Sequence, residues 1–161
     1  MEDLVRLNRF MQHYIDRLTA DLPDGRMTEQ PANGGNHAAW LLGHLAIAAD
    51  YGLPLLGGAY LCSPDWHRTF APGSKPQSDR SLYPGKEALV TAVAGGHAEL
   101  ARLAQAATAE QLDRPQPVEF LKPWVMTVRD LVGHLLTTHL ATHIGQFSAW
   151  RRQIGLAPIS L

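Results

Sequence analysis

Apolar residues recur every three or four positions in four stretches of the chain, and this spacing is typical of helices that bury one face. The stretches cover residues from about 3 to 21, from about 36 to 56, from about 85 to 106, and from 127 to just before Gly155. A strand would need alternating apolar and polar positions, and the sequence has no such stretch. The pattern therefore predicts an all-α protein.

Residues with strong positional preferences mark the ends of these helices. Asn33 or Asn36 can cap the free amide groups that open the second helix, and Pro84 suits the first position of the third. Thr127 and Asp130 resemble a capping box at the start of the fourth helix, with Asp in the place usually held by Glu or Gln. From there one continuous helix is expected.

Residues 58 to about 83, between the second and third helices, contain Pro, Gly and Ser throughout and show no sustained period. This segment is predicted to be a long irregular crossing. Connections of this length are uncommon inside compact domains and often carry function. A long crossing also allows helices two and three to run parallel, so we expect a four-helix bundle that forms one domain over residues 1–161.

Composition and charge exclude several kinds of partner. The net charge is −1 and the 14 Lys and Arg residues are scattered, so the basic stripe of a nucleic-acid-binding protein is absent and a membrane surface is disfavoured. The apolar stretch 38–56 contains His44, Asp50 and Pro54, which favours a buried helix over a membrane span. The single cysteine, Cys62, cannot form an intramolecular disulfide, and the N-terminus does not resemble a signal peptide, so a cytoplasmic location is expected.

Eight histidines are the chemically distinctive feature of the sequence. Each residue of an α-helix advances by about 100°, so His139 and His143 lie about 40° apart and one turn along the axis, where both rings can reach one ion. By the same arithmetic His134 points about 140° away from His139. Its spacing favours a local pair with Asp130 instead.

A third ligand must come from a facing helix. His44 is the candidate because it lies on the apolar stripe of the second helix, where an unpartnered imidazole would carry a desolvation cost of a few kcal/mol. His37, on nearly the same face, is the reserve ligand. The alternative is that these histidines are hydrogen-bonded or surface side chains and bind no metal.

The residues around the histidines exclude some metal chemistries. A zinc protease needs Glu directly after the first His of the pair, where this chain has Leu140, and no Glu-x-x-His pair suits a di-iron bundle. Three neutral imidazoles leave one coordination position open, as in a catalytic site. Cys62 is expected to be a passive thiol, because nothing near it in the sequence would lower its pKa.

The segments "WLLGHLA" and "TVRDLVGHLLTTHLATHIGQFSAWR" resemble the DinB-like superfamily, also called damage-inducible or YfiT-like metal-dependent hydrolases. The likeness spans nearly the whole chain. It implies a four-helix bundle with an up-down-down-up arrangement, often dimeric, that binds a divalent ion such as zinc or nickel through His44, His139 and His143. The better-understood branches are S-transferases and isomerases that use the thiols bacillithiol or mycothiol, and related proteins are described as hydrolases.

The resulting hypothesis is an ion that binds water or a low-molecular-weight thiol at its open position and lowers the pKa of that molecule, so that it attacks a small-molecule electrophile. Trp66, His67 and Phe70 of the crossing would supply an aromatic wall and a proton shuttle. The alternative for these three is a loop that closes one end of the bundle. Gln146 would hydrogen-bond to a ligand or to the bound water, or it would support helix packing.

A non-catalytic bundle is the rival interpretation, in which the ion stabilises the fold or the protein acts through a partner. A fourth protein ligand such as His37 in the open position would favour it. Phe10 and Tyr14 broaden the apolar stripe of the first helix, which is compatible with a homodimer. The alternative is that the long crossing covers this stripe.

Overall fold

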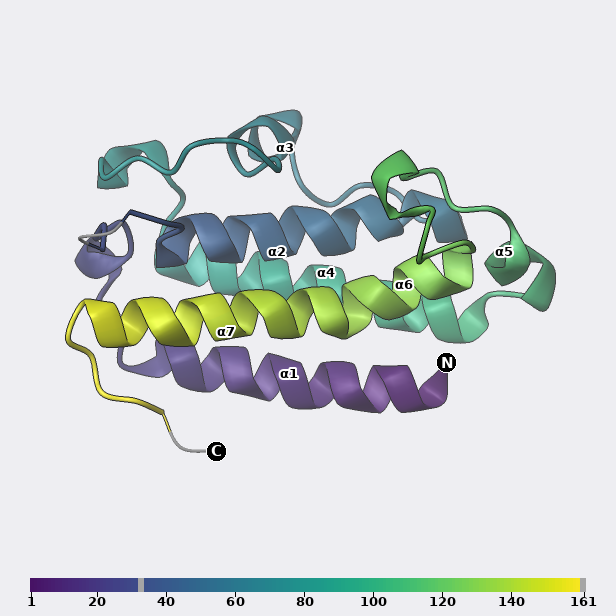
Figure 1. The fold of residues 1–161 in the computed structure, drawn as a ribbon, viewed down its shortest axis with the longest axis horizontal. Coiled ribbons are helices and arrows are strands. Elements are labelled where there is room, and N and C mark those ends of the chain that lie inside the picture. The colour runs from purple at the N-terminus through teal and green to yellow at the C-terminus, as the bar shows by residue number, and fades with distance from the viewer. Residues whose placement is uncertain (32–33, 160–161) are drawn as a thin grey trace.

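The computed structural model describes residues 1–31 and 34–159, and it is helical as predicted. Its larger helices pack side by side into a bundle (Figure 1): α1 (Glu2–Ala20), α2 (Ala38–Gly52), α4 (Lys86–Ala106), α6 (Val128–Leu136) and α7 (Thr138–Gln153). α6 and α7 follow one another along one side, so the bundle has four rods. The shorter elements are η1 (Asp24–Arg26), η2 (Pro54–Leu56), α3 (Pro64–Thr69), η3 (Arg80–Leu82), α5 (Ala109–Asp113) and η4 (Glu119–Leu121).

Contacts between the ends of the rods fix their directions. Lys86 N, at the start of α4, donates to Asp24 Oδ1 in the turn that follows α1 (2.7 Å). Arg151 Nη1, near the end of α7, donates to the carbonyl of Leu18 near the end of α1 (2.7 Å). α1 and α7 therefore end at the side of the bundle where α2 and α4 begin, and α2 and α4 run parallel (Figure 1).

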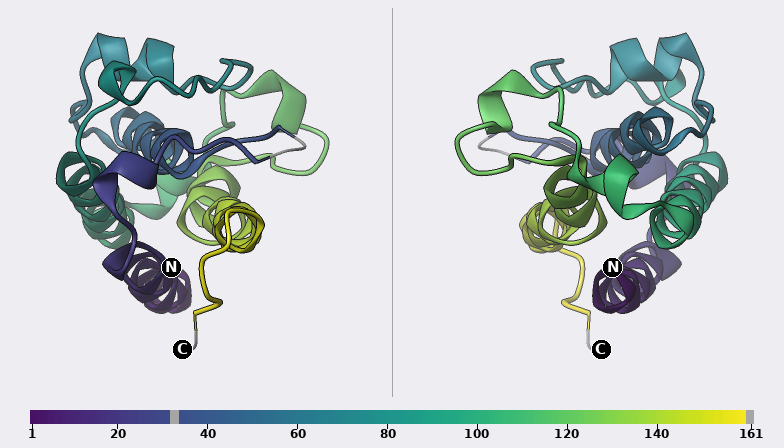
Figure 2. Two further views of the ribbon diagram at one scale, coloured as in Figure 1. Left: turned by 90° about the vertical axis from the view of Figure 1, so that its left-hand side faces the viewer. Right: turned by 90° about the vertical axis from the view of Figure 1, so that its right-hand side faces the viewer.

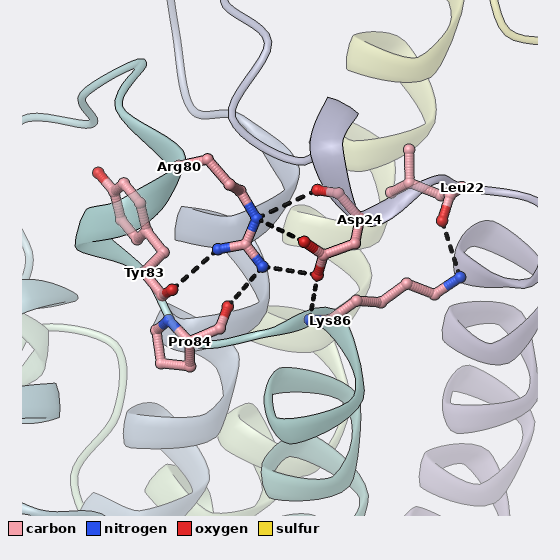
Figure 3. A network of polar contacts seen from close by, with 6 residues as sticks. All are labelled: Leu22, Asp24, Arg80, Tyr83, Pro84 and Lys86. Carbon is pink, nitrogen blue, oxygen red and sulfur yellow. Dashed lines mark hydrogen bonds and ion pairs between the residues drawn. The ribbon is translucent and has the colours of Figure 1, made fainter.

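A polar network fastens the end of the crossing at this side (Figure 3). Asp24 Oδ1 accepts from Arg80 Nη2 (2.6 Å) as well as from Lys86 N. Arg80 also donates to two backbone carbonyls just before α4, each at 2.8 Å. The N-cap of α4 is Gly85, which has no side chain to accept a hydrogen bond, so Asp24 caps α4 from another segment.

α2 packs against α4, α6 and α7 and lies beneath the crossing, and nearly all of its residues are buried (Figure 2). The stretch Ala38–Leu56 has the length and the mean hydropathy (1.3) of a membrane span, but 78% of it is buried among the other elements. A helix that is apolar all round is expected where other helices surround it. The structure therefore agrees with the interpretation of this stretch as a core helix.

The expectation of one continuous helix after Thr127 is wrong, because the helix breaks at Thr137 (φ −131°, ψ −80°). In a regular helix, the N–H of Thr137 would bond to the carbonyl of Gly133. Here the Thr137 hydroxyl takes that carbonyl (2.6 Å), and the N–H turns to the carbonyl of His134 (3.2 Å). A side chain that competes for a backbone carbonyl is a recognised cause of such breaks.

The predicted helix caps are partly correct. Thr127 and Asp130 form the expected capping box. The N-cap of α2 is His37 and not Asn36, while Asn33 lies outside the described residues. Pro84 precedes the first turn of α4 instead of opening it.

Both long connections lie on the α2 side of the bundle, away from α1 (Figure 2). The crossing, residues 58–83, contains α3 and η3, so it is less irregular than predicted. The second connection, residues 114–127, contains η4. The alternative that the crossing covers the apolar stripe of α1 is wrong, since Leu7 and Phe10 remain 49% and 48% exposed.

Candidate metal centre

The bundle brings together three histidines that could hold a metal ion: His44 from α2, and His139 and His143 from α7. One nitrogen from each ring lies within 4.8 Å of the nitrogens chosen from the other two. His44 Nε2 and His139 Nε2 are 3.3 Å apart. The turn of α7 presents its pair to the facing helix, as the spacing in the sequence predicts.

The donor set fits a divalent ion. Two nitrogens at about 2.0–2.1 Å from a tetrahedral zinc are separated by about 3.3 Å, which matches the distance between His44 Nε2 and His139 Nε2. His139 Nδ1 is buried and has no hydrogen-bond partner in the described part of the chain. No hydrogen bond on Nδ1 therefore fixes the tautomer of this ring, and a cation is a ligand that suits imidazole nitrogens converging from three rings.

Hydrogen bonds orient two of the three rings. His44 Nδ1 donates to the carbonyl of Phe70 (2.9 Å), because a carbonyl can only accept. His143 Nδ1 donates to Gln146 Oε1 (3.1 Å). Each bond leaves the Nε2 lone pair free, which is how residues behind metal-binding histidines select the tautomer. Gln146 is exposed, so its role is to hold His143 and not to support packing.

The surroundings keep these rings neutral at ordinary pH. Burial, together with the neighbouring His143 and His44, lowers the pKa of His139 to about 2. Burial and His44 likewise lower the pKa of His143 to about 4. Burial also lowers the pKa of His44. Neutral imidazoles are the form that binds metal, so protons compete weakly for this site.

The crossing holds the His44 side of the site through Phe70. The Phe70 side chain is fully buried against Gly43, where a Cβ atom would come within 2.3 Å of its ring. Trp40 stacks on His44 with 4.8 Å between ring centroids and 7° between planes. Trp40 Nε1 donates in turn to Ser74 Oγ in the crossing (2.7 Å).

A cavity of about 640 Å³ opens onto the three histidines. Its floor comes from α2, α6 and α7, and its walls come from the two long connections. Most of its lining is apolar, including Trp40, Ile47, Leu131, Leu135, Val118 and Phe120. Such a cavity is large enough for a small organic molecule, and it offers few polar groups besides the histidines.

The predicted aromatic wall is only partly present. His67 lines the cavity from α3, whereas Trp66 lines a separate hollow beside Cys62 and Phe70 is enclosed in the core. Successive residues of a helix point about 100° apart, and here Trp66 and His67 face different hollows. Phe70 takes part through its carbonyl and not through its ring.

Asp50 is a residue of this region that the sequence analysis missed. It is fully buried in α2 and accepts hydrogen bonds from Leu61 N (2.5 Å), Cys62 N (3.3 Å) and His67 Nε2 (2.7 Å). A carboxylate inside an apolar helix was a usable signal, because buried acids need partners. Burial raises the pKa of the Cys62 thiol to about 11, in agreement with a passive role.

His37 is not a ligand, and its designation as the reserve is wrong. Its Nδ1 accepts from Trp40 N (3.2 Å), so the neutral ring donates from Nε2 to the carbonyl of Gln77 (2.9 Å). Both nitrogens are therefore occupied in capping α2 and fastening the crossing. Among the described residues, no fourth histidine, cysteine or carboxylate joins the group of three.

The expected pair between His134 and Asp130 is also wrong. The Asp130 carboxylate accepts from the backbone N–H groups of Met126 and Thr127. The break at Thr137 turns His134 toward His139, with 5.5 Å between ring centroids, and His134 lines the same cavity. The angular arithmetic failed because it assumed an unbroken helix.

Comparison with known proteins identifies the family of the chain. The DinB superfamily profile matches residues 8–147, a range that contains all three histidines. A search of curated proteins finds no match to the chain. Because the profile covers most of the chain, the protein belongs to the DinB superfamily.

Proposed function

We propose that the protein is a metal-dependent enzyme in which His44, His139 and His143 bind a divalent ion, zinc or nickel. The ion would activate water or a low-molecular-weight thiol for attack on a small apolar electrophile. The observation that carries the proposal is the convergence of three neutral imidazoles, two of them oriented by hydrogen bonds, at the floor of a cavity of about 640 Å³. A divalent ion at such a site lowers the pKa of a water or thiol that it binds, so a nucleophile is available near neutral pH.

The residues of the chain have distinct roles in this proposal. The Phe70 carbonyl and Gln146 hold His44 and His143 in the tautomer that points Nε2 at the ion. The apolar walls bind the substrate and keep bulk water away from the reacting atoms, which strengthens electrostatic interactions there. The described residues provide no fourth ligand, and this supports a reactive ion over a purely structural one.

Metal analysis of His143→Ala tests the ligand assignment. We expect about one equivalent of zinc or nickel in the purified wild type and a large loss in the variant, because one of three ligands is removed. The matched control is His13→Ala, which removes an exposed histidine of α1 far from the site and should leave the metal content unchanged. Equal metal content in wild type and His143→Ala would contradict the assignment.

A second assay separates the two nucleophiles. The metal-loaded protein is incubated with a chloro-dinitro aromatic electrophile, with and without several low-molecular-weight thiols. Turnover that requires a thiol supports S-transfer, whereas thiol-independent turnover supports hydrolysis. If the metal-loaded protein turns over neither this electrophile nor activated esters, the non-catalytic interpretation is favoured.

A further inference from the structure

A second polar group faces the cavity from outside the histidine cluster. His67 belongs to α3 in the crossing, and its ring lines the same cavity as His44, His139 and His143. Asp50 of α2 accepts a hydrogen bond from His67 Nε2 at 2.7 Å. The two residues are 17 positions apart in the sequence, and the fold brings them together at the edge of the cavity.

Three hydrogen bonds to Asp50 determine which nitrogen of His67 carries the proton. Asp50 accepts from two backbone N–H groups, those of Leu61 and Cys62, which can only donate. Its side chain is fully buried, and within the described part of the chain it forms no ion pair with Lys or Arg. A carboxylate in this setting accepts the proton of His67 Nε2 and so selects the tautomer with a free lone pair on Nδ1.

Of the two side chains, Asp50 is enclosed by protein and His67 is partly exposed to solvent. The Asp50 side chain is 0% exposed, whereas the His67 side chain is 29% exposed. Tyr60 packs edge-on against the His67 ring, with 5.2 Å between ring centroids, and limits its rotation. One nitrogen is thus held by a buried acid, and the remaining nitrogen belongs to a ring on the cavity wall.

We propose that His67 is a catalytic general base and acid of this cavity, oriented by Asp50. This inference rests on the proposed function. His67 Nδ1 takes the proton of the attacking water or thiol: the O–H or S–H bond breaks, its electron pair stays on oxygen or sulfur, and the proton forms an N–H bond. The oxygen or sulfur forms a bond to the electrophile with this electron pair, and the bond to the leaving group breaks with its electron pair on that group. Asp50 stabilises the imidazolium, which then returns the proton to the leaving group.

The walls around His67 contain other titratable groups that the test must separate from it. They are Asp50 and Tyr51 of α2, Tyr60 and Cys62 of the crossing, and His44, His134, His139 and His143 across the cavity. Variants at position 67 isolate its own contribution. His67→Gln retains an N–H donor for Asp50 but has no nitrogen that accepts a proton, so it preserves the anchor of the loop and removes the base.

Nitrogen NMR of the histidines tests the pair without any activity. In metal-free wild type we expect His67 to be the Nε2–H tautomer while it is neutral. In Asp50→Ala the acceptor is lost, and a mixture of both tautomers should appear. A neutral His67 with its proton on Nδ1 in the wild type, or an unchanged tautomer in Asp50→Ala, would overturn the assigned orientation.

Kinetics of the metal-loaded enzyme test the chemical role. We expect kcat of His67→Gln to fall by about 100-fold or more, with metal content and thermal unfolding unchanged, because general acid–base groups typically contribute that much. The rise of rate with pH that requires an unprotonated base should also disappear. If the wild type turns over the substrate, a kcat of His67→Gln within threefold of the wild-type value would overturn the role of His67. An unaltered pH profile in His67→Gln would overturn it as well. Absence of turnover in the metal-loaded wild type would instead contradict the proposed function.

Discussion

At the scale of single residues, the geometry of the candidate metal centre depends on groups that contact its histidines from behind. Phe70 contributes a carbonyl to His44, and its ring occupies the space beside Gly43. The sequence predicted that three histidines converge, His139 and His143 from their helical spacing and His44 from its place in an apolar helix, and the structure brings these rings together. It could not select Asp50 with His67, because that pair forms across a loop whose path has no periodic signal.

Gly43→Ala should destabilise the protein, because its Cβ would lie 2.3 Å from the Phe70 ring and would force it to move. We expect a loss of about 1–3 kcal/mol in the free energy of unfolding, as for other overpacked cores. Denaturant unfolding of the metal-free protein measures it. The control is Gly95→Ala in α4, where nothing lies within 4 Å and a gain of about 0.5–1 kcal/mol is expected. A Gly43→Ala variant as stable as wild type would show that the ring has room to move.

At the scale of elements, the apolar period predicted the four rods and most of their ends, because each rod buries one face against the others. The period could not reveal the break at Thr137, since α6 and α7 together continue the same spacing. What decides the break is the Thr137 hydroxyl on the Gly133 carbonyl. The cap at His37 was also unforeseeable, because it depends on the crossing that receives its other nitrogen.

Asp24→Ala tests the hydrogen bond by which Asp24, in the turn after α1, caps the start of α4. Removing the carboxylate leaves Lys86 N without its acceptor and Arg80 without its ion-pair partner, so the free energy of unfolding should fall by about 1–2 kcal/mol. The control is Glu99→Ala, which breaks a surface ion pair with Arg102 on α4 and should cost at most about 0.5 kcal/mol. Denaturant unfolding near pH 7 compares the two.

The stabilisation that Asp24 provides should also depend on pH. Hydrogen bonding to Arg80 lowers the pKa of Asp24 below its ordinary value of 3.8. The stabilisation is therefore complete above about pH 4 and is lost as the pH falls through the lowered pKa. The difference between wild type and Asp24→Ala should shrink on acidification below pH 4. A difference that stays constant to the lowest pH at which the protein folds would argue against this anchor.

At the scale of the whole molecule, one buried asparagine links three rods. Asn8 of α1 donates through Nδ2 to His97 Nδ1 of α4 (3.0 Å) and to the carbonyl of Leu136 at the end of α6 (2.9 Å). His97 is almost fully buried, and burial lowers its pKa from 6.5 to about 4. The sequence analysis did not anticipate this contact, because partners 89 positions apart leave no local pattern.

His97 should make the bundle less stable in mild acid. Between about pH 6.5 and pH 4, His97 takes up a proton in the unfolded chain but not in the folded chain. The free energy of unfolding therefore decreases as the pH is lowered, by at most about 1.4 kcal/mol per pH unit. The free energy of unfolding of metal-free wild type and His97→Gln is measured from pH 7 to pH 4.5. The variant retains an acceptor for Asn8, and its curve should be flatter. Parallel curves would contradict the assignment, since the other buried histidines contribute equally to both proteins.

The two connections that wall the cavity are separate from the helices that form its floor. Phe70 of the crossing orients His44, whereas, among the described residues, Val118, Phe120 and Leu121 of the second connection line the cavity without a hydrogen bond to the three imidazoles. Changes in residues 114–127 can therefore alter the size and shape of the molecules admitted while the imidazoles stay where they are. Exchanging this connection for that of another bundle with the same floor should transfer substrate preference and leave ion affinity intact. This division of labour gives a single scaffold a simple route to new specificities.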